Sequence, residues 1–178
     1  PAGGGFLPHT KGICPMDSPI PTENLDASFD LVARQDATEQ AVESLRQRVP
    51  HRFVPILDMG CGTGLVGKQL VVEGYHVIDG LDLSPEMLDK ASALGVYRHL
   101  GECDLSEDIE LPQIYGAILC VGVFSHKLSQ PFDLVKLFLG LVPSGLLIAT
   151  VNGRGWRDID WPDLLQQSAR QHPFTIEE

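Results

Sequence analysis

The stretch that decides the fold is residues 56–67, which read ILDMGCGTGLVG. Residues 54–57 are a short apolar run that ends at Asp58, and the glycines that follow precede a helical pattern over residues 65–73. Glycines between a strand and a helix allow positive φ and bring backbone amides close to a ligand at the helix N-terminus. We therefore predict a ligand-binding strand–loop–helix unit at the carboxyl end of a buried strand.

Outside this unit, apolar strands alternate with amphipathic helices. The patterns predict helices at 28–49, 65–73, 85–94, 132–141 and 163–171, and strands at 54–57, 76–81, 97–103, 116–121 and 146–151. Residues 143–145, Pro-Ser-Gly, are predicted to be a turn. Strands that are apolar almost throughout and separated by helices indicate an α/β fold with a mostly parallel sheet. We expect one domain over residues 25–178, after a flexible Pro/Gly-rich arm at residues 1–24.

Composition restricts the possible partners. The 178 residues include 24 Asp and Glu and 13 Lys and Arg, which gives a formal charge of −11. This charge argues against extensive electrostatic contact with nucleic-acid phosphates. The four cysteines, Cys14, Cys61, Cys103 and Cys120, form no CxxC pair, which favours buried thiols in a reducing cytoplasm and no metal site. No apolar run reaches the about 18 residues that span a bilayer, so no membrane partner is expected. The sequence predicts no oligomeric state.

Two kinds of ligand fit the glycine loop. Gly62, Gly64 and Gly67 satisfy GxGxxG, a pattern that favours a dinucleotide and hence an NAD(P)-dependent oxidoreductase. Asp58, two residues before Gly60, favours another ligand, because its carboxylate would repel a pyrophosphate but suit an ammonium group.

Four further segments follow the loop: residues 77–88 (VIDGLDLSPEML), 102–105 (ECDL), 120–126 (CVGVFSH) and 141–147 (LVPSGLL). With them the chain resembles the class I S-adenosylmethionine-dependent methyltransferases. In the residues of its motifs it is most similar to the Williams–Beuren-region methyltransferase-like group. The resemblance implies a Rossmann-like doubly wound sheet with helices on both faces and S-adenosylmethionine as the cofactor. It also implies methyl transfer to a small-molecule acceptor, with S-adenosylhomocysteine as the product. A non-catalytic S-adenosylmethionine-binding module is the other interpretation left open.

The family's last strands are not visible beyond residues 174–176, and the chain starts at Pro1. This leaves open that it is a fragment with incomplete C-terminal strands.

The resemblance implies a set of cofactor-binding residues around the loop and the strand ends. Asp82 would hold the two ribose hydroxyls by charge-assisted hydrogen bonds, with Leu83 beside the adenine. Asp79 lies nearby but inside the strand, where it is less well placed. The full set is Asp58, Gly60, Cys61, Gly62, Thr63, Gly64, Asp82, Leu83, Met87, Asp104, Leu105, Cys120 and Val121. The alternatives are that Asp104 is an ordinary loop acid and that Met87 fills the core.

Methyl transfer from a sulfonium depends mainly on positioning, and a base helps only when the acceptor starts protonated. His126 follows the fourth strand and is the candidate base; the alternative is a solvent-facing loop histidine. Candidate acceptor-binding residues are Phe124, Asn152, Arg154 and Trp156; the alternative is a surface loop in which Trp156 is packed down as an anchor. The Asn/Asp-Pro-Pro-Tyr/Phe pattern of base-amino methyltransferases is absent after the fourth strand.

Overall fold

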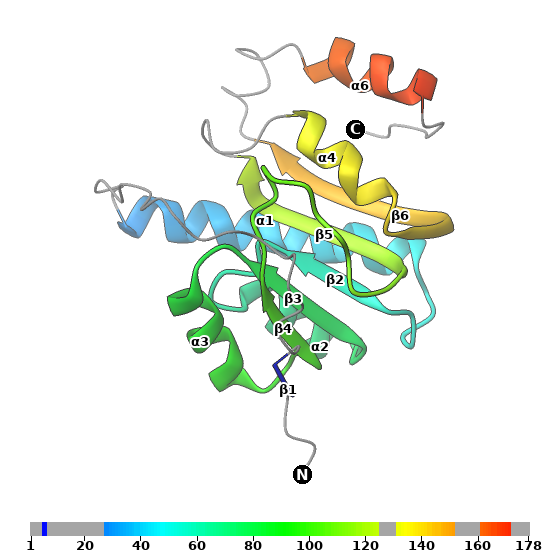
Figure 1. The fold of residues 1–178 in the computed structure, drawn as a ribbon. Coiled ribbons are helices and arrows are strands. Elements are labelled where there is room, and N and C mark those ends of the chain that lie inside the picture. Colours follow the sequence, from blue (N-terminus) through cyan, green and yellow to red (C-terminus); the bar gives the residue numbers. More distant parts are fainter. Residues whose placement is uncertain (1–4, 7–26, 125–130, 152–160, 172–178) are drawn as a thin grey trace.

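The computed structural model describes residues 5–6, 27–124, 131–151 and 161–171 (Figure 1). These residues form an alternation of helices and strands. In chain order the elements are β1 (Gly5–Phe6), α1 (Ala27–Arg48), β2 (Ile56–Met59), α2 (Leu65–Val72), β3 (Ile78–Asp82), α3 (Pro85–Leu94), β4 (His99–Glu102), β5 (Tyr115–Phe124), α4 (Pro131–Phe138), β6 (Leu141–Val151) and α6 (Trp161–Gln171). Among them, no helix is both long and apolar enough to cross a membrane.

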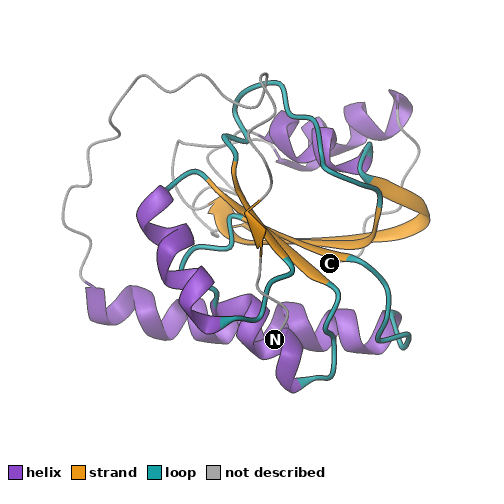
Figure 2. Ribbon diagram, turned by 60° about the horizontal axis from the view of Figure 1, so that its bottom comes forward, coloured by secondary structure: helices purple, strands orange, loops and turns teal. Residues whose placement is uncertain are grey.

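The strands form one sheet in the order β1-β4-β3-β2-β5-β6, and every pair is parallel. The chain builds outward from β2 in one direction through β3 and β4, then returns to add β5 and β6 on the other side. Helices lie on both sides of the sheet (Figure 2). The predicted Rossmann-like, doubly wound fold is therefore confirmed. The order reverses between β2 and β5, which is where open α/β sheets bind ligands.

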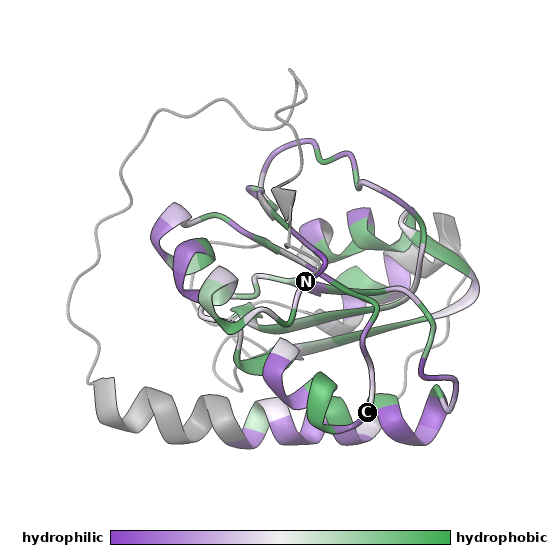
Figure 3. Cartoon of the chain, turned by 90° about the horizontal axis from the view of Figure 1, so that it is seen from below, coloured by the Kyte–Doolittle hydropathy of each residue, from purple (hydrophilic) through white to green (hydrophobic). Residues whose placement is uncertain are grey.

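The sheet separates two apolar clusters because successive side chains of a strand point to opposite faces. Ile56 packs with Leu45 of α1 and Leu70 of α2, whereas the next residue, Leu57, belongs to the cluster with Leu137 of α4. Burial on both faces explains why apolar residues predominate in the central strands of the sheet (Figure 3).

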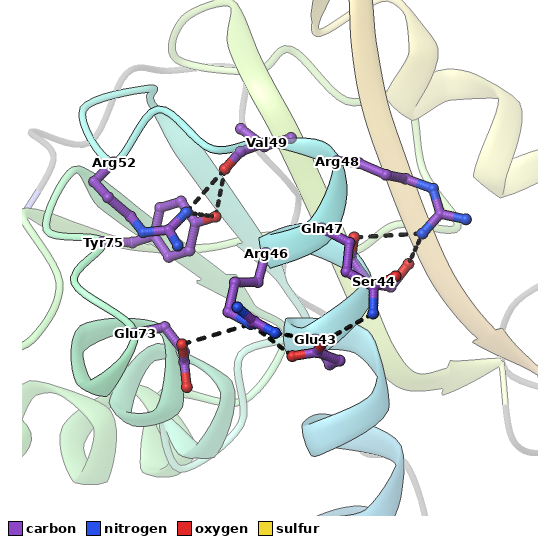
Figure 4. A network of polar contacts seen from close by, with 9 residues as sticks. All are labelled: Glu43, Ser44, Arg46, Gln47, Arg48, Val49, Arg52, Glu73 and Tyr75. Atoms are coloured by element: carbon purple, nitrogen blue, oxygen red, sulfur yellow. Dashed lines mark hydrogen bonds and ion pairs between the residues drawn. The ribbon is translucent and has the colours of Figure 1, made fainter.

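A network of polar contacts fastens the end of α1 to the segment between α2 and β3 (Figure 4). The Tyr75 hydroxyl donates to the Val49 carbonyl at 2.6 Å, and the Arg52 guanidinium lies 4.4 Å from the centre of the Tyr75 ring. Arg52 also donates to the Val49 carbonyl at 3.0 Å. These contacts lie where the chain enters β2 and β3, so they hold α1 against the sheet at the edge opposite the glycine loop.

Three predicted features differ from the structure. The predicted turn at residues 143–145 lies inside β6: the register moves from Tyr115↔Leu141 to Ala117↔Leu146, and Ser144 has φ 65°. Because leucines on both sides of Pro-Ser-Gly pair with β5, the extra residues form a bulge rather than end the strand. β5 continues three residues beyond its predicted end, and the predicted arm contains a two-residue strand, Gly5–Phe6, paired with β4. The domain limits themselves stay a prediction.

Candidate functional site

The glycine loop lies at the carboxyl end of β2, against β3. The amides of Gly60 and Cys61 both donate to the Leu81 carbonyl, at 2.7 and 3.0 Å. Gly60 has φ 72°, and Gly64, the N-cap residue of α2, has φ 89°, a conformation that a side chain disfavours. A Cβ built on Gly62 has no heavy atom within 4 Å, so the middle of the loop faces open space.

Asp82, the last residue of β3, joins this loop to the following helix. Its Oδ2 accepts from the Gly62 amide at 2.7 Å, and its Oδ1 accepts from the Ser84 amide at 2.9 Å. Ser84 is the N-cap of α3, with its hydroxyl accepting from the Met87 amide at 3.4 Å. Each carboxylate oxygen has two lone pairs, so Asp82 keeps capacity for ligand hydroxyls at the sheet edge.

Asp58 lies beneath the loop rather than on its surface. The residue is 0% exposed, and its Oδ2 accepts from the Tyr97 hydroxyl at 2.7 Å. Within the described residues its Oδ1 has no hydrogen-bond partner. Burial raises the pKa of Asp58 to about 7, and the Tyr97 hydrogen bond acts in the opposite direction. An ammonium group at the loop would therefore not touch Asp58 directly, and only the ionised form of this carboxyl group would attract it through the loop.

Tyr97, which sequence reasoning missed, organises the space around Asp58. A Cβ on Gly67 would overlap the Tyr97 ring, and a Cβ on Gly80 would lie 3.0 Å from it. The Gly67 amide donates to the Tyr97 hydroxyl at 3.2 Å. The third glycine of GxGxxG is thus explained by packing within the protein. The available signal was Gly80 inside a strand, because such a glycine often marks a close approach.

The carboxyl end of β5 also reaches the loop. Gly122 has φ 77°, and its amide donates to Thr150 Oγ1 of β6 at 2.8 Å. The register shifts here, so that Val123 and Phe124 both pack on the same cluster. Val123 occupies the position that a Cβ on Gly60 would need. Bulges commonly redirect side chains beside functional sites, and here the bulge places Val123 on the loop.

The other predicted cofactor residues divide between the edge and the interior. Leu83 and Thr63 are exposed and Met87 is half-buried, whereas Cys61, Leu105 and Cys120 are buried. Burial raises the pKa of both the Cys61 and the Cys120 thiol, which argues against thiolate chemistry. The expectation that the cysteines are buried is confirmed for Cys61, Cys103 and Cys120, and Cys14 lies outside the described residues.

Asp104 and Asp79 both have partners within the protein. Asp104 Oδ1 accepts from the Ser106 amide at 2.8 Å and from its hydroxyl at 2.6 Å, a turn geometry that matches the loop-acid alternative. Asp79 accepts from Arg98 Nη2 at 2.8 Å, from Gln113 at 2.7 Å and from the Tyr115 hydroxyl at 3.1 Å. Asp79 is therefore a structural acid near the amino ends of the strands, away from the glycine loop.

Phe124 is buried, and its ring packs edge-on against Trp161 with centroids 5.3 Å apart, so it lies in the core rather than on an open acceptor surface. The remaining predicted acceptor and base residues, His126, Asn152, Arg154 and Trp156, lie outside the described residues. The described part of the chain contains no group of three or more His, Cys, Asp or Glu residues placed to hold a metal ion.

Comparison with known proteins identifies the family. Residues 56–141 match the methyltransferase domain family. The chain is 41% identical to human methyltransferase-like protein 27 over 120 residues, 64% of this chain and 48% of that protein. It is 30% identical to the ubiquinone biosynthesis O-methyltransferase of Xylella fastidiosa over 118 residues, 62% of this chain and 47% of that enzyme. A shorter match, 56% identical over 45 residues, covers 25% of this chain and 15% of the Saccharomyces cerevisiae 18S rRNA (guanine(1575)-N(7))-methyltransferase.

Among solved structures, the fold is similar to magnesium protoporphyrin IX methyltransferase from Synechocystis, with a TM-score of 0.62 and 18% identity. That match covers 89% of this chain and 77% of the other. The chain spans about half the length of methyltransferase-like protein 27 and of the ubiquinone biosynthesis O-methyltransferase.

The site fits the cofactor of this family on two structural observations: open space over Gly62, and an edge carboxylate, Asp82, with acceptor capacity to spare. An exposed apolar side chain, Leu83, lies next to that carboxylate in the sequence. Residues 56–141 therefore form a methyltransferase domain of the class I S-adenosylmethionine-dependent kind.

Proposed function

We propose that the protein containing this chain transfers a methyl group from S-adenosylmethionine to a small-molecule acceptor in the cytoplasm. The observation that carries the proposal is the unit formed by Asp82 and Gly62 where the strand order reverses. It joins a carboxylate suited to ribose hydroxyls with an open backbone loop, at the edge where this fold binds ligands.

The cofactor supplies a methyl group on a sulfonium, which is already an activated leaving group. The chain's own task is then to bind and orient. Asp82 accepts from the ligand's hydroxyls, the carboxylate of Asp58 provides negative charge below the loop, and Val123 limits the space next to Gly60. Holding the reacting groups in line contributes on the order of 7–11 kcal/mol for well-oriented reactants. His126 is our proposed base for an acceptor that starts protonated, and Asn152, Arg154 and Trp156 are proposed to contact the acceptor.

Two observations favour a small acceptor over a nucleic acid. The formal charge of −11 disfavours contact with phosphates, and one relative is by its name an enzyme of ubiquinone biosynthesis. The relative named for 18S rRNA favours the other interpretation, but that match covers 15% of its length. RNA is therefore the second acceptor class to test.

Binding is tested first, by calorimetric titration with S-adenosylhomocysteine and, separately, with NAD(H) and NADP(H). Asp82→Asn should weaken S-adenosylhomocysteine binding about thirtyfold, since a hydrogen bond to a charged group contributes about 2 kcal/mol. Asp89→Asn, a change of the same chemistry at an exposed acid of α3, is the control and should bind normally. Binding of a dinucleotide and not of S-adenosylhomocysteine would refute the proposal, and unchanged affinity in Asp82→Asn would remove Asp82 from the site.

Transfer is tested next, with S-adenosylmethionine labelled in the methyl group. The acceptors are a panel of small phenols, carboxylates and amines on one side and total RNA on the other. Label in a small molecule supports the proposal, and label in RNA only would overturn the acceptor class. Binding without transfer to either would favour a non-catalytic module.

A further inference from the structure

We propose that Tyr97 is a positioning residue for cofactor binding, which fixes Asp58 and the first turn of α2 beneath the glycine loop. The inference rests on the proposed function, because it concerns the affinity for that cofactor.

The Tyr97 ring contacts two elements that surround the loop, α2 and β3. It lies between α3 and β4, is 6% exposed, and its ring packs against Gly67 of α2 and Gly80 of β3. A Cβ on Gly64, at the start of α2, would lie 3.2 Å from the same ring. A change at residue 97 is therefore transmitted directly to the loop.

The Tyr97 hydroxyl joins a helix amide to the buried acid. The Gly67 amide belongs to the first turn of α2, where helix amides have no partner within the helix. It donates to the Tyr97 oxygen at 3.2 Å, and the Tyr97 hydroxyl donates to Asp58 Oδ2 at 2.7 Å. One hydroxyl thus satisfies a helix end and holds a carboxylate.

The charge of Asp58 is poorly compensated without a ligand. The titratable groups that face it in the described structure are Tyr97, Cys61, Cys120 and Asp82, none of which is a cation. Its second oxygen has no hydrogen-bond partner there. A cationic ligand at the loop would therefore favour the ionised carboxylate, and by linkage the ionised carboxylate would favour the ligand.

Removing the Tyr97 hydroxyl has two consequences. Asp58 loses a donor that favours its ionised form, so its pKa rises further, and the Gly67 amide loses its acceptor. Tyr97→Phe should therefore bind a cationic cofactor more weakly and need a higher pH to bind it fully.

Tyr115→Phe provides the matched control. The Tyr115 hydroxyl donates to a buried carboxylate, Asp79, at 3.1 Å, and the residue is 0% exposed. This pair lies at the edge opposite the glycine loop. The two variants thus lose the same kind of hydrogen bond, only one of them beneath the cofactor site.

The experiment is calorimetric titration of wild type and both variants with S-adenosylhomocysteine from about pH 5.5 to 8.5, together with thermal unfolding. Wild-type affinity should fall as the pH drops below about 7, where Asp58 gains its proton. Tyr97→Phe should bind about tenfold more weakly at about pH 8, with its fall in affinity moved to higher pH. Tyr115→Phe should lose stability but keep wild-type affinity and pH profile.

Wild-type affinity and pH profile in Tyr97→Phe would overturn the inference alone, as would equal weakening in both variants. If Tyr97→Phe does not fold, Asp58→Asn keeps the Tyr97 contact and should bind with no pH dependence near neutrality; retention of the wild-type profile would overturn the inference. Wild-type protein that does not bind S-adenosylhomocysteine at all would overturn the proposed function, and this inference with it.

Discussion

Ionisation of the buried Asp58 lowers the stability of the folded protein, and replacement of Asp58 by Asn should remove this effect. Asp58 is wholly buried, and burial raises its pKa from 3.8 to about 7. The folded state therefore holds this proton more tightly than the unfolded chain does. The resulting stabilisation is fully present below about pH 4 and is lost as the pH rises toward 7. Asn cannot ionise, so the variant lacks this loss.

The size of the effect follows from the two pKa values. Each tenfold difference in proton affinity between folded and unfolded states corresponds to about 1.36 kcal/mol. The rise from 3.8 to about 7 therefore corresponds to about 4 kcal/mol of unfolding free energy. The new amide adds an unpaired N–H group where Oδ1 lies, but that cost is the same at every pH.

The assay is urea unfolding of wild type and Asp58→Asn at several values between about pH 4 and pH 8. As the pH rises across this range, the free energy of unfolding of the variant should increase by about 2–4 kcal/mol relative to that of wild type. Asp89→Asn, at an exposed position in α3, should run parallel to wild type. Parallel curves for Asp58→Asn as well would refute the reasoning, because they would mean that the buried carboxyl ionises as easily as in water.

Three further changes test the packing around the site by thermal or urea unfolding. Gly67→Ala puts a methyl group into the Tyr97 ring and should cost about 1–3 kcal/mol; a neutral effect would contradict the close contact. Asp79→Asn weakens a partly buried ion pair with Arg98 and should cost about 2–3 kcal/mol while S-adenosylhomocysteine affinity stays at the wild-type value; a loss of affinity would argue against a purely structural role. Thr150→Val removes the acceptor of the Gly122 amide and should cost about 1 kcal/mol, whereas Thr150→Ser keeps it, so equal loss in both would show that the hydroxyl does not matter.

The sheet and the position of the loop were predictable because their signals are local. Ile56 and Leu57 are both apolar because β2 is covered on both faces, and this pattern is readable without knowing the partners. Ser84 and Pro85 mark a helix start by their own chemistry, and the structure has α3 begin at Pro85. Together with the strand pattern, they place Asp82 at the strand end.

The contacts that the sequence did not reveal join residues far apart in the chain. Tyr97 lies 39 residues from Asp58, and Gly122 lies 28 residues from Thr150. No periodicity or spacing reports such pairs, because each depends on which strands become neighbours. The same holds for the bulge in β6, where Pro143 looked like part of a turn although the leucines on either side pair with β5.

The GxGxxG match shows how such a distant contact changes the meaning of a motif. In the dinucleotide fold the third glycine permits close packing of helix on strand. Here Gly67 is small because the Tyr97 ring lies against it, and that ring is held by Asp58, the residue that argued against a pyrophosphate. Gly67, which suggested a dinucleotide, and Asp58, which argued against one, therefore both contact the same buried side chain, Tyr97. A glycine pattern of this kind bears on the ligand only after the side chains that pack on each glycine are known.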